Sequence, residues 1–534
     1  MRSDLEDAAR AIEVASSVVR TAARKLANSG DLDDHQTIAY DMAHAASAVE
    51  VGRAMLDYAT HGDEEASLAC AFIADALADL SSRTFGREEE WGVDEGWYLP
   101  CKNFVVRYRE PSFLASLAAI EGQRHLDEEF ELVRATFRRF AEERVRPYAD
   151  RIHRENLDVP EEIIAGLAEL GGFGLSIPEQ YGGFATGTAG DFLGMVVATE
   201  ELSWGSLGAG GSLITRPEIL ARALINGGTE EQKMTWLPRL ADGSIMAAVA
   251  VTEPDFGSDV ANLTTQAVAY GDGWLINGVK TWCTFAARAN VLMLLARTNP
   301  DKSLAHRGLS LFVVEKPVAH GTGFSFTQRP LEEGQPVSSG KMEGRAIDTI
   351  GYRGMHSYEI SFDGWWVPAE ALVGGERGLG KGFYYQMQGF ENGRLQTAAR
   401  ALGVMQAAYE AAFSYATQRV VFAKPIYQYE LTKVKLGRMA VLIQAIRQFA
   451  YKVATLMASG VGSLEASMVK AYACRAAEWV TREAMQIHGG MGYAEEFPVS
   501  RYFVDARVLS IFEGADETLA LKVIARRLLD EASV

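Results

Sequence analysis

The sequence predicts a mainly α-helical protein with a central β domain and an additional helical segment at its N-terminal end. Apolar residues recur every three or four positions through most of residues 1–243, which is the spacing of amphipathic helices. Near Ile245 that pattern gives way to stretches rich in valine, isoleucine and aromatic residues, and helical spacing returns at about Gly378. Because helices and strands are grouped rather than alternating, the order disfavours a parallel βαβ sheet.

The composition of the 534-residue chain is that of a globular protein with several domains. Hydrophobic residues make up 48% and charged residues 23% of it, which excludes a fibrous or wholly disordered chain. The net charge of −18 disfavours nucleic-acid binding, because such a protein needs a basic face for the phosphates. An acidic chain can still hold an anionic ligand in a local basic pocket.

The cysteines and the apolar runs bear on the compartment. The four cysteines are widely spaced, so no close pair forms the pattern of a zinc, iron–sulfur or thioredoxin-like site. Apolar runs such as residues 245–251 are too short to cross a bilayer, and the charged first residues do not form a signal peptide. We therefore expect a soluble, cytoplasmic protein with free thiols, no metal centre and no membrane partner.

Residues 1–112 are expected to form a helical extension followed by a linker. Up to residue 82, alanine-rich helical spacing predicts three packed helices. Between residues 82 and 111 the periodicity fades. Glycines, prolines and tryptophans that we expect to be exposed indicate a connecting segment there.

The next domain boundaries lie where the spacing of the apolar residues changes. Residues 113–244 are expected to be a second helical domain and residues 245–374 a β domain, in which Gly271-Asp272-Gly273 stands where a hairpin turn is needed. Residues 375–534 return to helical spacing and are expected to form a C-terminal helical bundle. The strands predicted in the β domain are residues 245–252, 264–270, 274–276, 291–298 and 309–314.

Two nucleotide-binding motifs are incomplete or absent from the sequence. Residues 375–382 nearly spell a P-loop, but Gly382 stands where a magnesium-binding serine or threonine is required, so we favour a flexible loop that enters a helix. No GxGxxG fingerprint supports a Rossmann nicotinamide site. A lone histidine such as His488 is more often structural than a metal ligand.

The informative segments are residues 251–259 and 277–284, which read VTEPDFGSD and NGVKTWCT. Each alone could be an ordinary strand-to-turn junction. Together they resemble the flavin-binding β domain of the acyl-CoA dehydrogenase family, with its TEPxxGSD loop and KxWxT strand.

Three later segments agree with this resemblance in the expected order. Residues 418–426 (QRVVFAKPI) are similar to the family's RxxFGKPI stretch, residues 486–493 (QIHGGMGY) to its QxxGGxG turn, and residues 511–518 (IFEGADET) to its IYEGTSE segment. The resemblance covers about residues 125–534. It implies the family fold of a helical domain, a β-barrel domain and a C-terminal four-helix bundle, here preceded by the helical extension.

The resemblance also implies a reaction and a catalytic base. Dehydrogenating an acyl thioester removes an α proton and a β hydride, so a base and a flavin must flank the Cα–Cβ bond. The glutamate of the family segment corresponds to Glu513, our predicted base, in a closed apolar site that strengthens it. Some relatives place the base at the position of Gly393, which has no side chain. Arg394 corresponds to a family arginine close to the base, with a plain helix-surface arginine as the alternative.

FAD is the implied cofactor. Arg419 and Phe422 correspond to residues that reach the FAD of the neighbouring subunit, which implies a homodimer. The chain departs from the motifs at Ala423, where RxxFGK has glycine, and at Ala515, where EGTS has threonine, and these departures bear on individual flavin hydrogen bonds rather than on the fold. The residues that correspond to flavin contacts are Val251, Thr252, Ser258, Trp282, Thr284, Arg419, Phe422, Gln486, Gly490 and Glu517.

The substrate class comes from a further resemblance. The extension, together with residues 213–218 and 349–358, resembles family members that act on a short, branched dicarboxylic acyl-CoA. A carboxylate at the far end of the acyl chain needs a cationic partner once water is expelled, and arginine can bind it with two hydrogen bonds. The candidates are Arg216, Arg353 and Arg394, of which Arg353 also matches a common family arginine and could be purely structural.

Other functions stay open at this point. A dehydrogenase of neutral short or branched acyl-CoAs, of the butyryl or isovaleryl type, would carry the same motifs. An acyl-CoA oxidase has its extra helical domain after the catalytic one, whereas here the addition precedes it. A non-catalytic acyl-CoA-binding scaffold would be expected to lose the base. We therefore favour a dehydrogenase with electron-transferring flavoprotein as its acceptor.

The helical extension has two interpretations. It could be a docking module for another protein, or it could cover the surface that relatives use to pair dimers into tetramers. We favour the second, because its alanine-rich faces are typical of helix packing and no block of exposed charge marks a docking tail. A dimer is the expected assembly.

Overall fold

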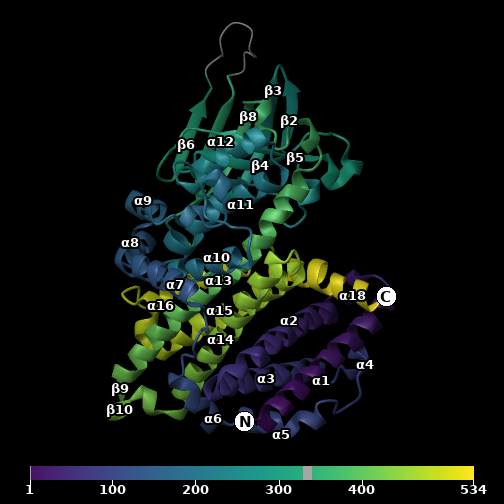
Figure 1. The fold of residues 1–534 in the computed structure, drawn as a ribbon, viewed down its shortest axis with the longest axis vertical. Coiled ribbons are helices and arrows are strands. Elements are labelled where there is room, and N and C mark those ends of the chain that lie inside the picture. Colours follow the sequence, from purple (N-terminus) through teal and green to yellow (C-terminus); the bar gives the residue numbers. More distant parts are fainter. Residues whose placement is uncertain (1, 329–338, 534) are drawn as a thin grey trace. The chain divides into compact units, whose positions relative to one another are not determined.

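The computed structural model describes residues 2–328 and 339–533 (Figure 1). The chain divides into two compact units: unit 1 is Met1–Ala135 with Arg394–Val534, and unit 2 is Thr136–Gly393. Helices precede and follow one group of strands, as the hydrophobic spacing predicts. The mainly α-helical fold with a central β domain is therefore confirmed.

The N-terminal segment of unit 1 forms the three packed helices that the spacing predicts. Most side chains of the second helix are buried, because alanines at the contact positions let neighbouring helices approach closely. The first helix packs against the second and the third. These helices are α1 (Arg2–Ala27), α2 (Gln36–Tyr58) and α3 (Asp63–Thr84).

The segment after α3 differs from the expected exposed linker. It contains three short helices, and Trp91 at the end of the first is fully buried rather than exposed. An isolated tryptophan carries no periodicity, so its tertiary burial leaves no trace in the local pattern. The short helices are α4 (Glu88–Trp91), α5 (Lys102–Tyr108) and α6 (Pro111–Ser116).

The C-terminal part of unit 1 is built on long helices, against which α2 of the extension packs directly (Figure 1). The extension is thus an integral layer of this unit. The elements are α14 (Glu430–Ala458), α15 (Ser463–His488), α16 (Pro498–Leu509), α17 (Asp516–Thr518), α18 (Arg526–Ala532), the two-stranded hairpin β9 (Val420–Val421) and β10 (Lys424–Pro425), and α13 (Gly382–Gln418), which crosses the boundary between the units.

Most helices of unit 2 precede its strands in the chain. A capping box at Thr229 and Gln232 starts the last of these helices, where each residue's side chain bonds the other's backbone N–H. Pro217 interrupts the backbone hydrogen bonding of another, next to Arg216. The helices are α8 (Arg146–Glu155), α9 (Glu161–Glu169), α10 (Ala189–Gly205), α11 (Leu213–Gly227) and α12 (Glu230–Ala241), with α7 (Glu128–Phe140) crossing the unit boundary.

One sheet of eight strands forms the β domain of unit 2, with the path β1-β4-β2-β3-β8-β7-β6 and with β5 paired to β4. The predicted hairpin is present: Tyr270 pairs with Gly273, and Gly271 takes the left-handed φ of 60° that the turn requires. The strands are β1 (Ala247–Ala250), β2 (Gln266–Tyr270), β3 (Gly273–Thr284), β4 (Val291–Arg297), β5 (Leu309–Glu315), β6 (Gly323–Thr327), β7 (Lys341–Ile347) and β8 (Ser357–Pro368).

The core of unit 2 lies on both faces of the central strands. Every residue of β4 is buried, and its side chains contribute alternately to two apolar clusters. One cluster contains helical residues such as Leu220 and Leu237, so helices cover that face. This burial explains why β4 reads as a continuous apolar run rather than an alternating one.

The described residues contain no helix with the length and apolar character of a membrane span. Within the same residues, no three histidine, cysteine, aspartate or glutamate side chains gather as a metal site. All four cysteines are buried and unbridged, as expected.

Candidate active site

The predicted base Glu513 lies in unit 1, on the turn between α16 and α17. Its side chain is only 9% exposed. Thr397 Oγ1 donates to one carboxylate oxygen at 2.8 Å, and Arg400 Nη2 donates to the other at 2.7 Å. Two donors therefore fix the orientation of this carboxylate and satisfy it inside the unit. Glu513 is thus buried as expected, but a guanidinium and a hydroxyl face its carboxylate in place of the expected apolar surroundings.

Arg400 is a site residue that the sequence analysis missed. It is fully buried on α13, donates to Thr397 as well as to Glu513, and its guanidinium lies 4.8 Å from the centroid of the Phe512 ring. A charged residue inside the apolar, alanine-rich pattern of this helix was the available clue, because a buried arginine needs an anionic partner.

The backbone at Glu513 is in an unusual conformation. Glu513 has a φ of 54° and Gly514 a φ of 100°, so two successive residues occupy the region that only glycine enters freely. The buried Lys470 of α15 donates from Nζ to the Gly514 carbonyl at 2.5 Å. Burial lowers the pKa of Lys470. The turn that presents Glu513 is thus held from within the helical bundle.

Arg394 is also buried in unit 1, which excludes the surface-arginine alternative. Its Nη1 donates to Ser467 Oγ of α15 at 3.1 Å. Asn392, two residues earlier and in unit 2, donates to Glu218 Oε1 at 3.4 Å. On each side of the unit boundary, α13 therefore carries a buried polar side chain that is hydrogen-bonded within its own unit.

The remaining predicted flavin residues of unit 1 are exposed. Arg419 and Phe422 belong to the β9–β10 hairpin, where Phe422 is 90% exposed at a φ of 48°. Ala423 follows at a φ of 66°, which explains in physical terms why the motif has glycine there. The other residues of this group, all exposed, are Gln486, Gly490 and Glu517.

The two predicted flavin segments of unit 2 lie side by side. Thr281 N–H donates to the Thr252 carbonyl at 2.8 Å, and Lys280 Nζ donates to the Val251 carbonyl at 2.9 Å. The TEPxxGSD and KxWxT segments are therefore joined by main-chain and side-chain bonds. Ser258 lies on the exposed end of the first segment.

A buried ion pair ties these segments together. Lys280 Nζ lies 2.9 Å from Glu253 Oε1, and both side chains are almost fully buried. Thr264 and Thr265 donate their N–H groups to the two oxygens of Glu253 at 2.7 and 2.8 Å. Burial alone would raise the pKa of Glu253, but the Lys280 ammonium and the hydrogen-bond donors lower it to about 2.

This ion pair makes the stability of unit 2 depend on pH. Since the pKa of Glu253 falls from 4.5 to about 2 on folding, its stabilisation is fully present above pH 4.5 and is lost as the pH falls toward 2. Acidification from about pH 6 to pH 3 is therefore expected to lower the Tm of the wild type more than that of the double variant Glu253→Gln/Lys280→Met. Equal losses in thermal melts would contradict the assignment.

The β-domain segments fit a flat aromatic cofactor. Trp282 presents an indole that is 55% exposed, and its φ of 57° marks a backbone held in a strained conformation. A Cβ added at Gly257 would meet no atom within 4 Å, so the TEPxxGSD loop leaves open space beside it. Thr284 is buried, and its hydroxyl is paired with Ser357 Oγ at 2.9 Å. Thr284 is therefore placed inside the strand pair rather than on an open face.

The two remaining arginine candidates differ in their surroundings. Arg353 donates from Nη1 to the His153 carbonyl at 2.6 Å and from Nε to the Thr349 carbonyl at 3.1 Å, so it closes the loop before β8. Arg216 is 5% exposed on α11, and its Nε donates to the Ser212 carbonyl at 3.3 Å. These contacts favour a structural role for Arg353, and Arg216 is the more deeply buried of the two candidates in unit 2.

Three family models match the chain in sequence: acyl-CoA dehydrogenase, N-terminal domain, over residues 127–244, middle domain over residues 248–365, and C-terminal domain over residues 380–529. The chain is 41% identical to (2S)-methylsuccinyl-CoA dehydrogenase of Cereibacter sphaeroides, over 94% of this chain and 92% of that protein.

Solved structures agree with these matches. A glutaryl-coenzyme A dehydrogenase in complex with glutaryl-CoA superposes with a TM-score of 0.67 at 30% identity, over 76% of this chain and 96% of that chain. A structure described as the electron transferring flavoprotein of Acidaminococcus fermentans has a TM-score of 0.67 at 29% identity, over 76% and 99% of the two chains. With three matched domains and this fold, the chain belongs to the acyl-CoA dehydrogenase family, whose members are oxidoreductases that act on CH–CH groups.

Proposed function

We propose that this protein is an FAD-dependent dehydrogenase that oxidises (2S)-methylsuccinyl-CoA to mesaconyl-CoA, a step of the ethylmalonyl-CoA pathway. The observation that carries the chemistry is the buried carboxylate of Glu513, held by Thr397 and Arg400 on a turn of unusual backbone geometry. The similarity to the Cereibacter enzyme supports the substrate, because it covers 94% of the chain and so includes the helical extension.

In this proposal Glu513 takes the α proton of the thioester onto its carboxylate. Thr397 and Arg400 keep the carboxylate in one orientation, so that little rearrangement precedes proton transfer. Bound FAD would supply the acceptor for the β hydride, and the electron pair of the broken Cα–H bond would form the double bond. The backbone N–H of Glu513 is assigned to the thioester oxygen, where it would stabilise the developing enolate.

The residues proposed to hold FAD in unit 2 are those of the two joined segments. Trp282 would pack on the isoalloxazine and screen it from water, while Val251, Thr252 and Ser258 would donate or accept at the ring edge and the pyrophosphate. Thr284, being bonded to Ser357, would support the Trp282 strand.

The residues proposed to hold FAD in unit 1 are the exposed ones. Gln486, Gly490 and Glu517 would contact it from the helical bundle, and Arg419 and Phe422 would reach the FAD of a second copy, so we propose a homodimer. Electron-transferring flavoprotein is the proposed acceptor, and the cytoplasm the proposed location.

The distal carboxylate of the substrate is assigned to Arg216. Its guanidinium is buried next to the break that Pro217 makes in α11, and a buried guanidinium suits a carboxylate that is shielded from water. Arg394 is the second candidate, because it is buried on α13. Arg353 is assigned to the loop whose carbonyls it binds.

The test is anaerobic bleaching of the flavin band with separate acyl-CoA substrates. We expect rapid bleaching by (2S)-methylsuccinyl-CoA and slow or no bleaching by succinyl-CoA, isovaleryl-CoA and butyryl-CoA. Rapid bleaching by the neutral thioesters instead would establish the neutral alternative and discard the diacid. A protein that stays colourless after addition of FAD would discard the flavoenzyme.

Arg216→Met is expected to lower kcat/KM for (2S)-methylsuccinyl-CoA by about 30-fold or more, because loss of one partner of a desolvated charge pair costs about 2 kcal/mol or more. The rate with isovaleryl-CoA, which is already slow in the wild type, should not fall further, since that thioester has no carboxylate. The matched variant is Arg222→Met on the same helix. Equal losses with both thioesters would remove Arg216 from carboxylate recognition.

A further inference from the structure

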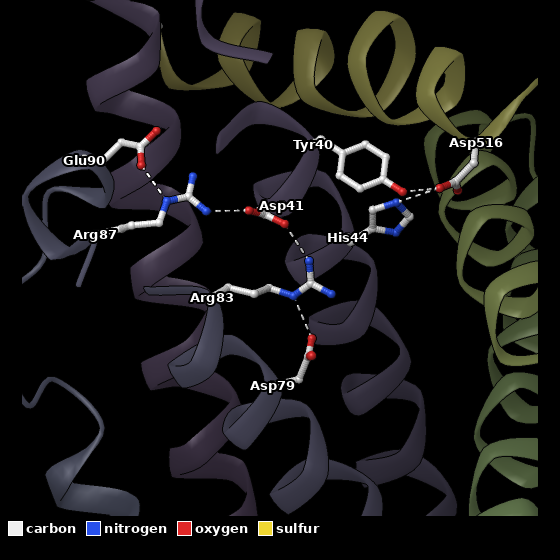
Figure 2. A network of polar contacts seen from close by, with 8 residues as sticks. All are labelled: Tyr40, Asp41, His44, Asp79, Arg83, Arg87, Glu90 and Asp516. Atoms are coloured by element: carbon white, nitrogen blue, oxygen red, sulfur yellow. Dashed lines mark hydrogen bonds and ion pairs between the residues drawn. The ribbon is translucent and has the colours of Figure 1, made fainter. Parts of the chain in front are cut away.

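Asp516, the first residue of α17, receives two hydrogen bonds from the N-terminal extension (Figure 2). Tyr40 Oη donates to Asp516 Oδ2 at 2.5 Å, and His44 Nε2 lies 3.2 Å from the same oxygen. Tyr40 and His44 are one helical turn apart on α2, so both side chains point from one face of that helix toward the carboxylate. The extension therefore contacts the chain three residues after Glu513.

Tyr40 and His44 are the hydrogen-bond donors of this cluster, and the Asp516 carboxylate is the acceptor. Burial would raise the pKa of Asp516, but the bonds from His44 and Tyr40 hold it below its ordinary value. Burial lowers the pKa of His44, the hydrogen bond to Asp516 acts against that shift, and Nε2 is the ring nitrogen that faces the carboxylate. Burial and the Asp516 carboxylate raise the pKa of Tyr40 to about 12. Asp516 and His44 are 7% and 4% exposed, so solvent does not compete for these bonds.

The orientation of α2 is itself fixed by a second set of contacts (Figure 2). Asp41, next to Tyr40 in the chain, accepts from Arg83 at 2.7 Å and from Arg87 at 2.8 Å. Arg83 and Arg87 are in turn paired with Asp79 and Glu90. A helix held at Asp41 presents its Tyr40 and His44 face in one direction only.

The turn between Ser510 and Asp516 needs such an anchor. Asp516 N–H donates to the Ser510 carbonyl at 3.1 Å, so the segment closes on itself around the left-handed Glu513 and Gly514. Residues in this region persist only where their surroundings over-determine them. Lys470 holds the turn at Gly514, and the extension holds its downstream end at Asp516.

We propose that Tyr40 and His44 are positioning residues for the reaction, which act through Asp516 on the placement of Glu513. This inference rests on the proposed role of Glu513 as the base. In the IYEGTSE motif that this segment resembles, serine stands at the position of Asp516, so the carboxylate that the extension binds is a departure from that motif. In this proposal the N-terminal extension helps to place the catalytic base.

The test compares Tyr40→Phe with Tyr58→Phe in the FAD-loaded full-length protein. Both remove one hydroxyl from the extension, and the Tyr58 hydroxyl donates to the Gln123 carbonyl, away from the Glu513 turn. With (2S)-methylsuccinyl-CoA, Tyr40→Phe is expected to lower kcat about 10- to 100-fold with KM within about threefold, because a small misplacement of a reacting group has effects of this size. Tyr58→Phe should stay within twofold of the wild type.

Three further variants keep the test decisive. Asp516→Asn should reproduce the kcat loss without changing side-chain volume, and His44→Gln, whose amide can still donate, should retain more activity than His44→Ala. Equal kcat values for Tyr40→Phe, Asp516→Asn and Tyr58→Phe would overturn the inference. A wild type that no acyl-CoA bleaches would overturn the proposed function first, and the two failures are thereby distinguished.

Discussion

Glu513→Gln is expected to give a yellow protein that turns over about 10²–10⁴-fold more slowly than the wild type. The amide has nearly the same shape, and Thr397 can still donate to its carbonyl oxygen. The buried Arg400 loses this anionic partner, so the Tm of the variant is also expected to fall, and turnover is compared at a temperature where both proteins are folded. It has no basic oxygen to accept the α proton. Anaerobic single-turnover bleaching by (2S)-methylsuccinyl-CoA measures the loss directly, because it reports the chemical step before any electron acceptor is involved.

Glu531→Gln is the matched control for this prediction. Glu531 belongs to an exposed pair with Arg527 on α18, and its loss should leave turnover unchanged. The visible spectrum should show equal flavin content in both variants. Near-wild-type turnover of Glu513→Gln would mean that another group removes the proton.

Lys280→Met is expected to have the largest effect on stability. Removal of one partner of a buried ion pair leaves an uncompensated charge and costs about 3–5 kcal/mol. For a unit of this size that loss corresponds to a fall in Tm of roughly 6–20 °C. Flavin content should fall as well, since Lys280 joins the strand of Trp282 to the Val251 carbonyl.

Two control variants separate the effect of losing a lysine from the effect of leaving a buried charge without its partner. Lys302→Met removes an exposed lysine of unit 2 and should leave the Tm unchanged within about 1–2 °C. The double variant Glu253→Gln/Lys280→Met removes both charges and should recover part of the loss. Thermal melts followed by circular dichroism measure all three. A Lys280→Met protein as stable as Lys302→Met would show that the pair contributes little.

Local periodicity was sufficient to predict the elements that obey it. The three N-terminal helices, the five strands from β1 to β5 and the turn at Gly271 follow from spacing and turn chemistry, and the structure has them. The sequence analysis does not predict β6, β7 and β8 as separate strands. The turn-rich sequence before β8 hid its start, and its alternating buried and exposed residues are recognised only once β3 and β7 are paired with it.

The site was predictable where a motif spans neighbouring residues, and not where it depends on long-range contacts. Glu513 and the Trp282 strand lie inside short recognisable segments. Arg400 and Asp516 became visible only when helices distant in sequence were placed together, because no local pattern says which buried arginine meets which carboxylate. Trp91 was expected to be exposed for the same reason.

Unit 1 is built from the two ends of the chain, so its folding depends on the order in which the chain is synthesised. Unit 2 is one continuous segment, so all of it has been synthesised before residue 394, whereas the first helices of unit 1 must wait for α14 and α15. At about 5–20 residues per second, translation of the intervening unit takes on the order of tens of seconds. During that time the apolar side of α2 has no partner from the C-terminal helices, so chaperones that hold nascent helices are expected to engage it.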